Sequence, residues 1–319
     1  PLHAARAALP RPSLCLNVPK TGTQFMNRFL DAADWLHLKR ACGLRRLRPP
    51  GGAAIRVVRR IKRHGIEFGN LNSRLPHYHA GYSACPAGLR RHPKLCALRG
   101  VRDWYCSFHL YHTLKMKNTL LSRAIRVLAE GGRERDPHVR ALLLRHRRAF
   151  LERFEGEDAT SRSIENVSVA FLVWYMQTLR LPNMVRIWLG AGVRPPPVGF
   201  LTFRAIAVLF ENPKRLFGMP PEEFENHFSS GRYRRDLRCE HILRTETLTG
   251  DLCAAMTGPL GYAPDIVEHL RSHATRRNAS PEAARTRILR ELEADGLLER
   301  IRRRERIYER YLLPLAGRR

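Results

Sequence analysis

Acidic side chains are scarce in this sequence, and long apolar segments are absent from it. Its 319 residues include 29 Asp and Glu against 57 Lys and Arg, so the formal net charge at pH 7 is +28. The longest apolar run, residues 167–176, is interrupted by Ser168 and is far shorter than the roughly 20 residues of a membrane-spanning helix. The sequence therefore predicts no transmembrane segment. With no signal peptide visible, it predicts a cytoplasmic protein and leaves open an anchor upstream of Pro1.

Motifs that identify several other enzyme classes are also missing. None of the seven cysteines is at CxxC spacing, no Cys/His cluster has zinc-ligand spacing, and the odd number argues against a complete disulfide framework. The Gly-x-Ser-x-Gly elbow and the dinucleotide-binding glycine fingerprint are absent. We therefore expect reduced, mostly buried thiols and no metal, and we disfavour hydrolases of that type and nicotinamide-dependent enzymes.

The excess of positive charge has two interpretations. Basic residues are spread along the whole chain, which fits a solvated basic surface, but a polyanion such as nucleic acid, an acidic glycan or an anionic lipid would also be attracted. A nucleic-acid-binding protein is thus an alternative from another functional class, and it predicts basic and aromatic residues clustered on one face. The first interpretation predicts no specific nucleic-acid partner.

Short apolar runs alternate with helical periodicity along the chain. Residues 14–18, 94–98 and 239–244 suit buried parallel strands, and the pattern between 119 and 230 is largely helical. The basic stretch 40–63, interrupted by Pro-Pro-Gly-Gly, is typical of an exposed loop that leads into another strand or helix. Strands that alternate with helices predict an α/β fold with a central parallel sheet flanked by helices.

A candidate phosphate-binding loop lies between the first predicted strand and the first predicted helix. Backbone N–H groups converge at such a turn and the helix N-terminus is electropositive. Glycine allows close approach of the backbone, while the lysine, hydroxyl and amide side chains can donate to an anion: Lys20, Thr21, Gly22, Thr23 and Gln24. It is not a Walker A loop, because the first glycine is missing and the lysine precedes the glycine. A structural turn with a helix cap would explain the same residues.

A second candidate site follows the second predicted strand. Arg99 lies at the carboxyl end of that strand, where open α/β sheets bind ligands. Ser107 comes eight residues later, in the first turns of the next helix, so both side chains could contact one phosphate. On these residues alone, a basic loop capped by Asp103, with Trp104 and Tyr105 in the core, is the simpler explanation.

Taken together, the two segments resemble the sulfotransferases that use 3′-phosphoadenosine-5′-phosphosulfate (PAPS). Residues 16–30, LNVPKTGTQFMNRFL, are similar to the family's 5′-phosphosulfate loop, with Gln24 at a position that is often Thr. Arg99 and Ser107 match its 3′-phosphate motif at the family's spacing, although Gly100 and Val101 replace the usual Asn/Asp-Pro. Two motifs in the correct order, about 80 residues apart, are more specific than either alone.

Three further segments extend the resemblance. Residues 77–82, His-Tyr-His-Ala-Gly-Tyr, resemble the acceptor-side segment of bacterial members. Residues 243–251 resemble a later strand and turn of the family. A basic loop that closes over the nucleotide in the family is matched by Arg276, Arg277 and Asn278.

The resemblance implies a single sulfotransferase domain over residues 1–319 with a P-loop-like core. The nucleotide-binding core would comprise about 12–115 and 236–280, the helical acceptor-side region about 116–235, and the C-terminal helical tail 281–319. The implied reaction moves a sulfuryl group from PAPS to a small-molecule or glycan hydroxyl, with carbohydrate or glycolipid favoured by the basic charge. A P-loop-like small-molecule kinase is the alternative among enzymes.

The resemblance also implies roles for individual residues. Lys20 would stabilise charge on the leaving oxygen, and His79 would be the general base, with His77 and Glu67 as alternatives. The 3′-phosphate would be held by Arg99 and Ser107. Residues that would complete the PAPS site are Thr21, Gly22, Thr23, Gln24, Arg276, Arg277 and Asn278. No metal is implied.

Overall fold

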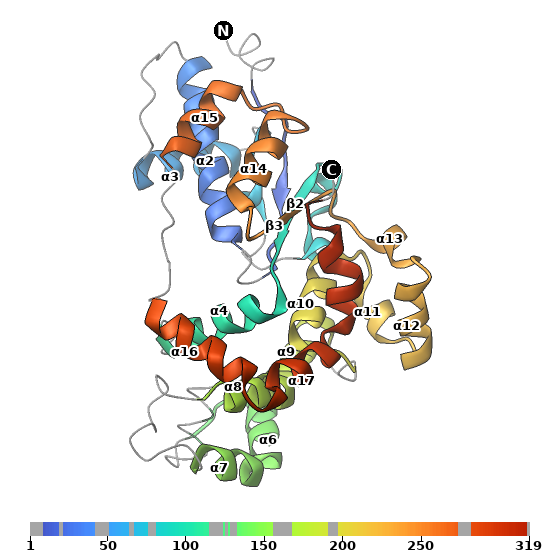
Figure 1. Cartoon of the computed structure of the whole chain (residues 1–319). Coiled ribbons are helices and arrows are strands. Elements are labelled where there is room, and N and C mark those ends of the chain that lie inside the picture. The colour runs from blue at the N-terminus through green and yellow to red at the C-terminus, as the bar shows by residue number, and fades with distance from the viewer. Residues whose placement is uncertain are drawn as a thin grey trace.

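The structure, a computed structural model, describes most of the chain. The described residues are 9–18, 22–41, 51–63, 67–75, 81–114, 124, 127, 133–155, 168–190, 197–273 and 282–317. Within them the chain is mostly helical and contains a small three-stranded sheet (Figure 1). Of the helices described there, none combines the length and the hydropathy that a membrane span requires.

The sheet is parallel throughout. Its strands are β1 (Leu14–Cys15), β2 (Lys94–Leu98) and β3 (His241–Arg244), arranged in the order β1-β2-β3. Leu95 lies opposite Cys15 on one side and His241 on the other. The predicted parallel sheet is therefore confirmed, but it is small, and helices dominate the chain.

One face of the sheet packs on three helices. Successive residues of a strand point to opposite faces, and Leu95 and Ala97 of β2 share a buried cluster with these helices. They are α2 (Thr23–Ala41), α14 (Leu248–Thr257) and α15 (Pro264–Ser272). In Figure 1 the three helices lie together beside the strands.

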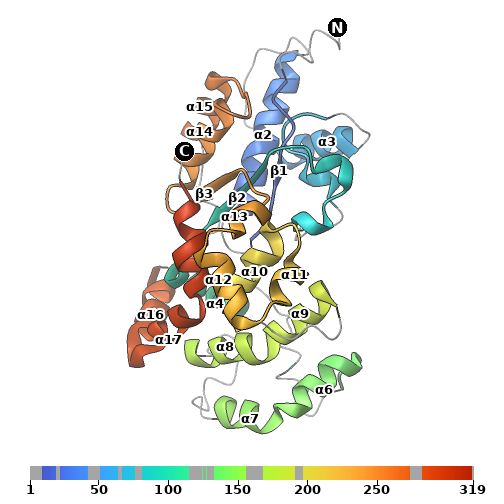
Figure 2. The same ribbon diagram turned by 90° about the vertical axis from the view of Figure 1, so that its right-hand side faces the viewer.

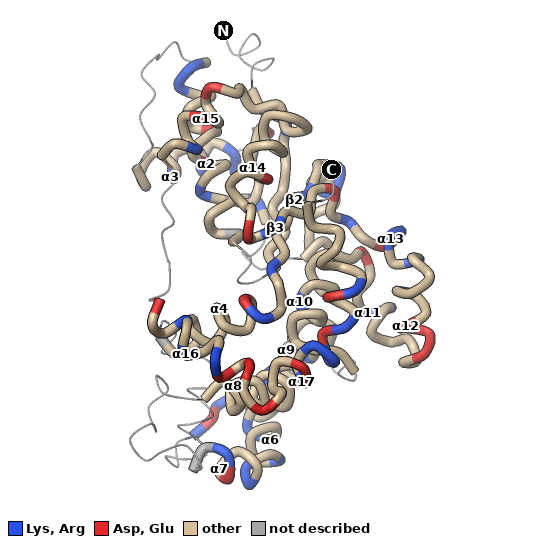
Figure 3. Tube along the Cα trace, in the orientation of Figure 1, with Lys and Arg blue, Asp and Glu red and all other residues tan. Residues whose placement is uncertain are grey.

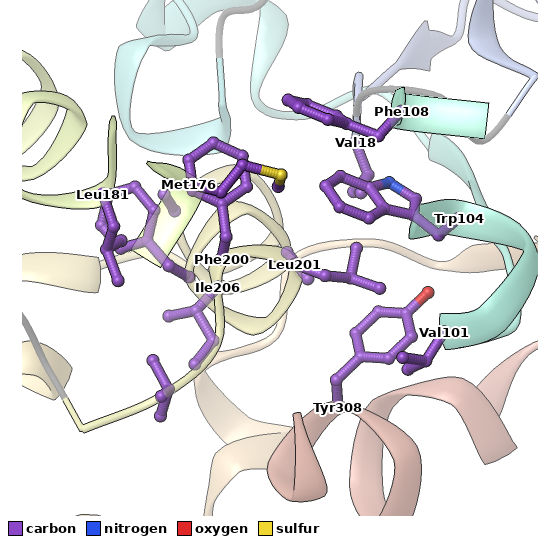
Figure 4. Packing of buried hydrophobic residues seen from close by; sticks show 14 of the residues in the cluster. Val18, Val101, Trp104, Phe108, Met176, Leu181, Phe200, Leu201, Ile206 and Tyr308 are labelled. Carbon is purple, nitrogen blue, oxygen red and sulfur yellow. The ribbon is translucent and has the colours of Figure 1, made fainter. Parts of the chain in front are cut away.

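The opposite face of the sheet packs on the helices of the larger buried cluster. Cys96 and Leu98 belong to this cluster, as do α4 (Val101–Leu114) and α10 (Phe200–Leu209). Figure 4 shows part of it, including Val18 from the segment after β1. Because both faces are covered, the strands are apolar nearly throughout, as parallel strands usually are.

The expectation of an exposed loop over residues 40–63 is wrong for its second half. Gly52–Arg63 form α3, which packs on α2. Lys62 is fully buried and pairs with Asp34 of α2, whose carboxylate also accepts from the backbone N–H of Asn70 at 3.0 Å. This basic segment therefore forms a helix, and one of its own basic residues, Lys62, holds the helix against α2.

The structure describes three short 3₁₀ turns before β2: η1 (Asn72–Arg74), η2 (Tyr82–Ala84) and η3 (Ala87–Leu89).

The described residues between β2 and β3 are largely helical, as predicted for this part of the chain. Asp136 caps the helix that follows it, since its carboxylate accepts from the N–H groups of His138 at 3.0 Å and Val139 at 3.2 Å. Figure 2 shows α6 and α7 at the end of the molecule farthest from the sheet. After α4, the described elements are α6 (Pro137–Arg145), α7 (Arg147–Glu155), α8 (Val169–Tyr175), the π-helix η6 (Met176–Arg180), α9 (Leu181–Leu189), α10, α11 (Pro213–Phe217), α12 (Pro221–Ser229) and α13 (Tyr233–Asp236).

The C-terminal tail returns to the sheet. Its helical chain is broken at Gly296, where Asp295 and Gly296 have φ values of 51° and 64°. The last described residue, Gly317, donates its N–H to the carbonyl oxygen of Ile242 in β3 at 2.9 Å. The tail contains α16 (Glu282–Glu293), η7 (Ala294–Gly296), α17 (Leu297–Arg304), the π-helix η8 (Tyr308–Leu312) and η9 (Leu313–Leu315).

Candidate functional site

The carboxyl ends of the three strands lie at one edge of the sheet, because all three strands are parallel. The chain after β1 leads to Gly22 and the start of α2, and the chain after β2 leads through Arg99 to α4. The chain after β3 leads through residues 245–247 to α14. Both predicted binding segments therefore belong to the edge at which open α/β sheets bind ligands.

Gly22 is required by both conformation and space. Its φ of 87° is in the left-handed region that side chains other than glycine rarely adopt, and a Cβ atom there would collide with the Leu248 side chain. The carbonyl oxygen of Gly22 accepts from the N–H of Met26 at 3.1 Å, within the first turn of α2. That turn contains no acidic residue, so the helix N-terminus keeps its positive partial charge. Gln24, in the same turn, is exposed.

The turn between β3 and α14 connects the two predicted segments. Leu248 contacts Gly22, and two positions earlier the Glu246 carboxylate accepts from the N–H of Gly100 at 3.2 Å. The N–H and the hydroxyl of Thr245 both donate to the carbonyl oxygen of Leu98, at 2.8 and 2.9 Å. The segment that resembled the family's later strand and turn thus holds the other two in a fixed relation.

Arg99 carries a positive charge that the described residues do not neutralise by an ion pair. Burial lowers the pKa of its guanidinium, and the carboxylates of Asp103 and Glu246 counteract this only in part. Among the residues that the structure describes, no acid lies within ion-pair distance of it. Arg99 is half-buried, and a partly desolvated cation without a paired acid is costly in free energy, so its surroundings favour an anion.

Arg285 is a basic residue of this site that the sequence interpretation missed. It lies in α16 and donates to the Asp103 carboxylate at 2.8 Å, which fixes it beside α4. Its positive charge also lowers the pKa of Arg99, so the two guanidinium groups are close enough to repel each other. The only sequence signal was its position a few residues after the basic stretch that contains Arg276 and Arg277.

Ser107 lies on α4 one helical turn after Asp103, so the two residues share a face of the helix. Its side chain is half-buried. The same face is the one on which Arg285 binds, and Trp104 and Phe108 project into the buried cluster instead. Arg99, Ser107 and Arg285 are thereby assembled around the beginning of α4.

Several predicted site residues lie outside the described residues. They are Lys20, Thr21, His77, His79, Arg276, Arg277 and Asn278, and the side chain of Thr23 belongs with them. Their predicted roles therefore stay predictions. The described residues that flank them are Val18 and Gly22 on either side of the first group, and Gly81 after the second.

Gly81, in the segment that resembled the acceptor side, packs directly on α10. A Cβ atom at this position would collide with the carbonyl oxygen of Ala207 and with the backbone of Val208. Its own backbone is extended, with φ of −80° and ψ of 176°, so close approach explains the glycine and conformational freedom does not. The chain that follows His79 is thus fixed to a buried helix.

Glu67, the alternative general base, lies at the amino-terminal edge of the sheet, opposite the edge that carries Arg99. Its carboxylate pairs with Arg74 and Arg91, each at 2.7 Å, and with His92 at 3.3 Å. Arg91 and His92 immediately precede β2, whereas Arg99 immediately follows it. The hypothesis that Glu67 is the base is therefore contradicted by its position.

A shallow cavity of ≈ 360 Å³ borders the carboxyl end of β3. Its lining comes from the β3–α14 turn and from the end of the tail. Arg244 lines it and donates from Nε to the carbonyl oxygen of Ala316 at 3.0 Å. The cavity is lined by Arg244, Thr247, Asp251, Pro314, Ala316 and Gly317.

The basic residues are distributed over the whole described chain. Figure 3 shows Lys and Arg on elements at both ends of the molecule, from α2 and α15 to α6 and α17. Many of them pair with acids, as Arg238 does with Glu211 and Arg306 with Glu225 at 2.8 Å. This distribution does not single out one face for a nucleic acid. In the described part of the chain, no group of three or more His, Cys, Asp or Glu residues could hold a metal ion.

Comparisons with protein-family models, with curated proteins and with solved structures found no match for this chain.

Proposed function

We propose that this protein is a sulfotransferase that transfers the sulfuryl group of PAPS to a hydroxyl acceptor. The observation that carries the proposal is the unneutralised Arg99 at the carboxyl edge of the sheet, beside Ser107 and the Gly22 turn. The helix N-terminus has no acidic residue and the same edge carries a half-buried cation, and together they suit a ligand with anions at two ends. PAPS is such a ligand, with its 3′-phosphate and its 5′-phosphosulfate.

In this proposal the nucleotide spans the two turns. The backbone N–H groups at the start of α2 bind the 5′-phosphosulfate, with hydroxyl donors from Thr21 and Thr23. Arg99 and Ser107 bind the 3′-phosphate and so select PAPS over ATP, and Arg285 adds a second guanidinium. Because Arg285 already pairs with Asp103, that acid is neutralised before the phosphate arrives.

The proposed chemistry is an in-line displacement at sulfur. The acceptor oxygen forms a bond to sulfur as the bond between sulfur and the 5′-phosphate oxygen breaks, and adenosine 3′,5′-bisphosphate leaves. Lys20 stabilises the negative charge that grows on the breaking oxygen, an effect of the oxyanion-hole kind. His79 takes the proton of the acceptor hydroxyl. No step requires a metal ion.

Transfer of a radioactive sulfuryl group tests the proposal directly. The protein is incubated with ³⁵S-labelled PAPS and an extract that contains candidate acceptors, and labelled products are identified. Parallel reactions contain heat-denatured protein, or ATP labelled in its γ-phosphate. We expect a product that carries ³⁵S and requires folded protein. Transfer of phosphate from ATP, with none of sulfate, would support the kinase alternative instead.

A further inference from the structure

Arg204 is a buried charge that is not matched by any acid among the described residues. It lies in the middle of α10 with 4% of its surface exposed, and its Nε atom has no hydrogen-bond partner. The fold pairs its other buried charges: Lys62 binds Asp34, and Glu305 accepts from four donors of Tyr105, Leu201 and Thr202. Arg204 thus differs from Lys62 and Glu305, because no acid among the described residues compensates the cost of burying its charge.

A second arginine lies close to it. Arg180, at the end of the π-helix η6, is half-buried, and its Nε atom also has no partner. Burial, together with the positive charge of Arg180, lowers the pKa of Arg204 to about 9. The positive charge of Arg180 therefore acts against that of Arg204 in a poorly solvated region. π-Helices are rare and are frequent at functional sites.

Aromatic rings hold both guanidinium groups in place. Arg204 lies over the ring of Trp188 at 4.1 Å, and Arg180 lies over Phe108 at 5.7 Å and Phe200 at 5.9 Å. Stacking on a ring leaves the N–H groups at the edge of a guanidinium available, and these form the planar fork that binds an oxyanion. Arg180 is half-buried, so part of its side chain is exposed to solvent, whereas Arg204 is buried.

The pair is adjacent to the proposed acceptor side. Phe108, under Arg180, directly follows Ser107 on α4 and projects from another face of that helix. On α10, Arg204 lies one turn before Ala207, against which Gly81 packs. The segment after His79 and the arginine pair are therefore fixed to the same buried helix.

We propose that Arg180 and Arg204 bind an oxyanion, a carboxylate or a sulfate ester, carried by the acceptor. That the anion belongs to the acceptor rests on the proposed sulfotransferase function. The anion site itself follows from the two arginines. The chemistry predicts an acceptor that is already acidic before transfer, such as a uronic acid or a sulfated sugar. A neutral acceptor would leave both charges uncompensated.

Trp188 provides a direct measurement, because it lies against Arg204. Its fluorescence is followed during titration with glucuronate, glucose 6-sulfate or neutral glucose at constant ionic strength, and a Trp188→Phe variant identifies its signal among the four tryptophans. We expect one or both acidic sugars to change the signal, and glucose to have no effect. A response to glucuronate alone assigns a carboxylate, and a response to the sulfate alone assigns a sulfated acceptor.

Variants decide whether the arginines cause the response. Arg204→Met and Arg180→Gln should each weaken acidic-sugar binding at least tenfold, and Arg148→Gln, on an exposed arginine of α7, should leave it unchanged. Arg180→Gln keeps the test valid if Arg204→Met fails to fold. Equal binding by both folded variants and the parent, or no response to any acidic sugar, would overturn the inference. Titration with adenosine 3′,5′-bisphosphate separates the two proposals. If the bisphosphate binds and no acidic sugar changes the signal, only this inference is contradicted. If an acidic sugar changes the signal and the bisphosphate does not bind, only the proposed sulfotransferase function is contradicted.

Discussion

The hydroxyl of Tyr308 forms two hydrogen bonds with the backbone of Arg99. It accepts from the N–H of Arg99 at 3.1 Å and donates to the carbonyl oxygen of Arg99 at 2.9 Å. The two residues are 209 positions apart in the chain, and Tyr308 is fully buried. The C-terminal tail thereby fixes the residue that leaves β2 toward the candidate nucleotide site.

Removing this hydroxyl should disturb stability and nucleotide binding together. Tyr308→Phe leaves the N–H and the carbonyl of Arg99 without their partner, which costs about 1–3 kcal/mol of unfolding free energy. We expect weaker binding of adenosine 3′,5′-bisphosphate as well, because the position of Arg99 is no longer fixed. Tyr233→Phe is a matched control, since it removes a buried hydroxyl that donates to Tyr311 at 3.0 Å. A Tyr308→Phe variant that binds like the control would contradict this role.

Gly22→Ala should be destabilising, because alanine cannot easily adopt a φ of 87° and its methyl group would collide with Leu248. We expect a loss of about 1–3 kcal/mol in chemical denaturation. Adding Leu248→Ala should recover only the part due to the collision. Gly250→Ala, in the first turn of α14 with no atom near its Cβ position, should stabilise by up to about 0.5–1 kcal/mol. Equal effects at the two glycines would show that the turn has no special geometry.

Much of the sheet edge was predictable, because its signals are local. The run at 94–98, followed directly by Arg99 and a helix, is a strand and a turn that need no knowledge of distant residues, and β2 has these bounds. Asp136 followed by Pro137 is a local signal of the same kind, and α6 begins there. The predicted strand at 14–18 is shorter in the structure, where only Leu14–Cys15 are in register with β2 as a strand.

Features that depend on contacts between distant segments could not be predicted. Nothing near Tyr308 indicates that its hydroxyl binds Arg99, and nothing near Arg285 indicates that Asp103 fixes it beside α4. Thr247 directly precedes α14, yet its hydroxyl donates to Asp251 at 2.9 Å and makes no cap hydrogen bond. Side-chain partners of this kind are chosen by packing, and periodicity does not report them.

The two histidines before Gly81 should differ in their effect on turnover. His79→Ala should lower kcat by about 10²–10⁴-fold, the usual contribution of a general base, while affinity for adenosine 3′,5′-bisphosphate stays unchanged. His77→Ala should reduce kcat much less. Steady-state rates and calorimetry on the two variants check this. The opposite order would make His77 the base, and full activity of both variants would refute both assignments.

Asp136 should give α6 a stability that depends on pH. The backbone N–H of Val139, then that of His138, lower the pKa of Asp136 in the folded state. A depressed folded pKa stabilises above the unfolded value near 3.8 and is lost as pH falls through the folded value. Asp136→Ala should therefore cost about 1 kcal/mol at pH 7 and less at pH 3. Asp136→Asn, which keeps a capping oxygen without a charge, is the control, and a cost independent of pH would contradict the argument.

Arg99→Gln should separate binding from stability. Since burial already opposes the charge of Arg99, its removal should not lower the unfolding free energy. It should weaken binding of a 3′-phosphate by on the order of 10–100-fold, the equivalent of a lost charge-assisted hydrogen bond. Arg102→Gln is the matched control, because Arg102 is the next arginine along the chain and pairs with Glu293 at 2.6 Å. The control should bind like the parent protein.

The most direct measurement is a calorimetric comparison of adenosine 3′,5′-bisphosphate with AMP, which lacks the 3′-phosphate. If Arg99 and Ser107 bind the 3′-phosphate, the bisphosphate should bind at least tenfold more tightly than AMP. In Arg99→Gln the difference between the two nucleotides should largely disappear, and in Arg102→Gln it should persist. Equal affinity of the parent protein for both nucleotides, or binding of neither, would contradict the assignment of this chain as a PAPS-dependent sulfotransferase.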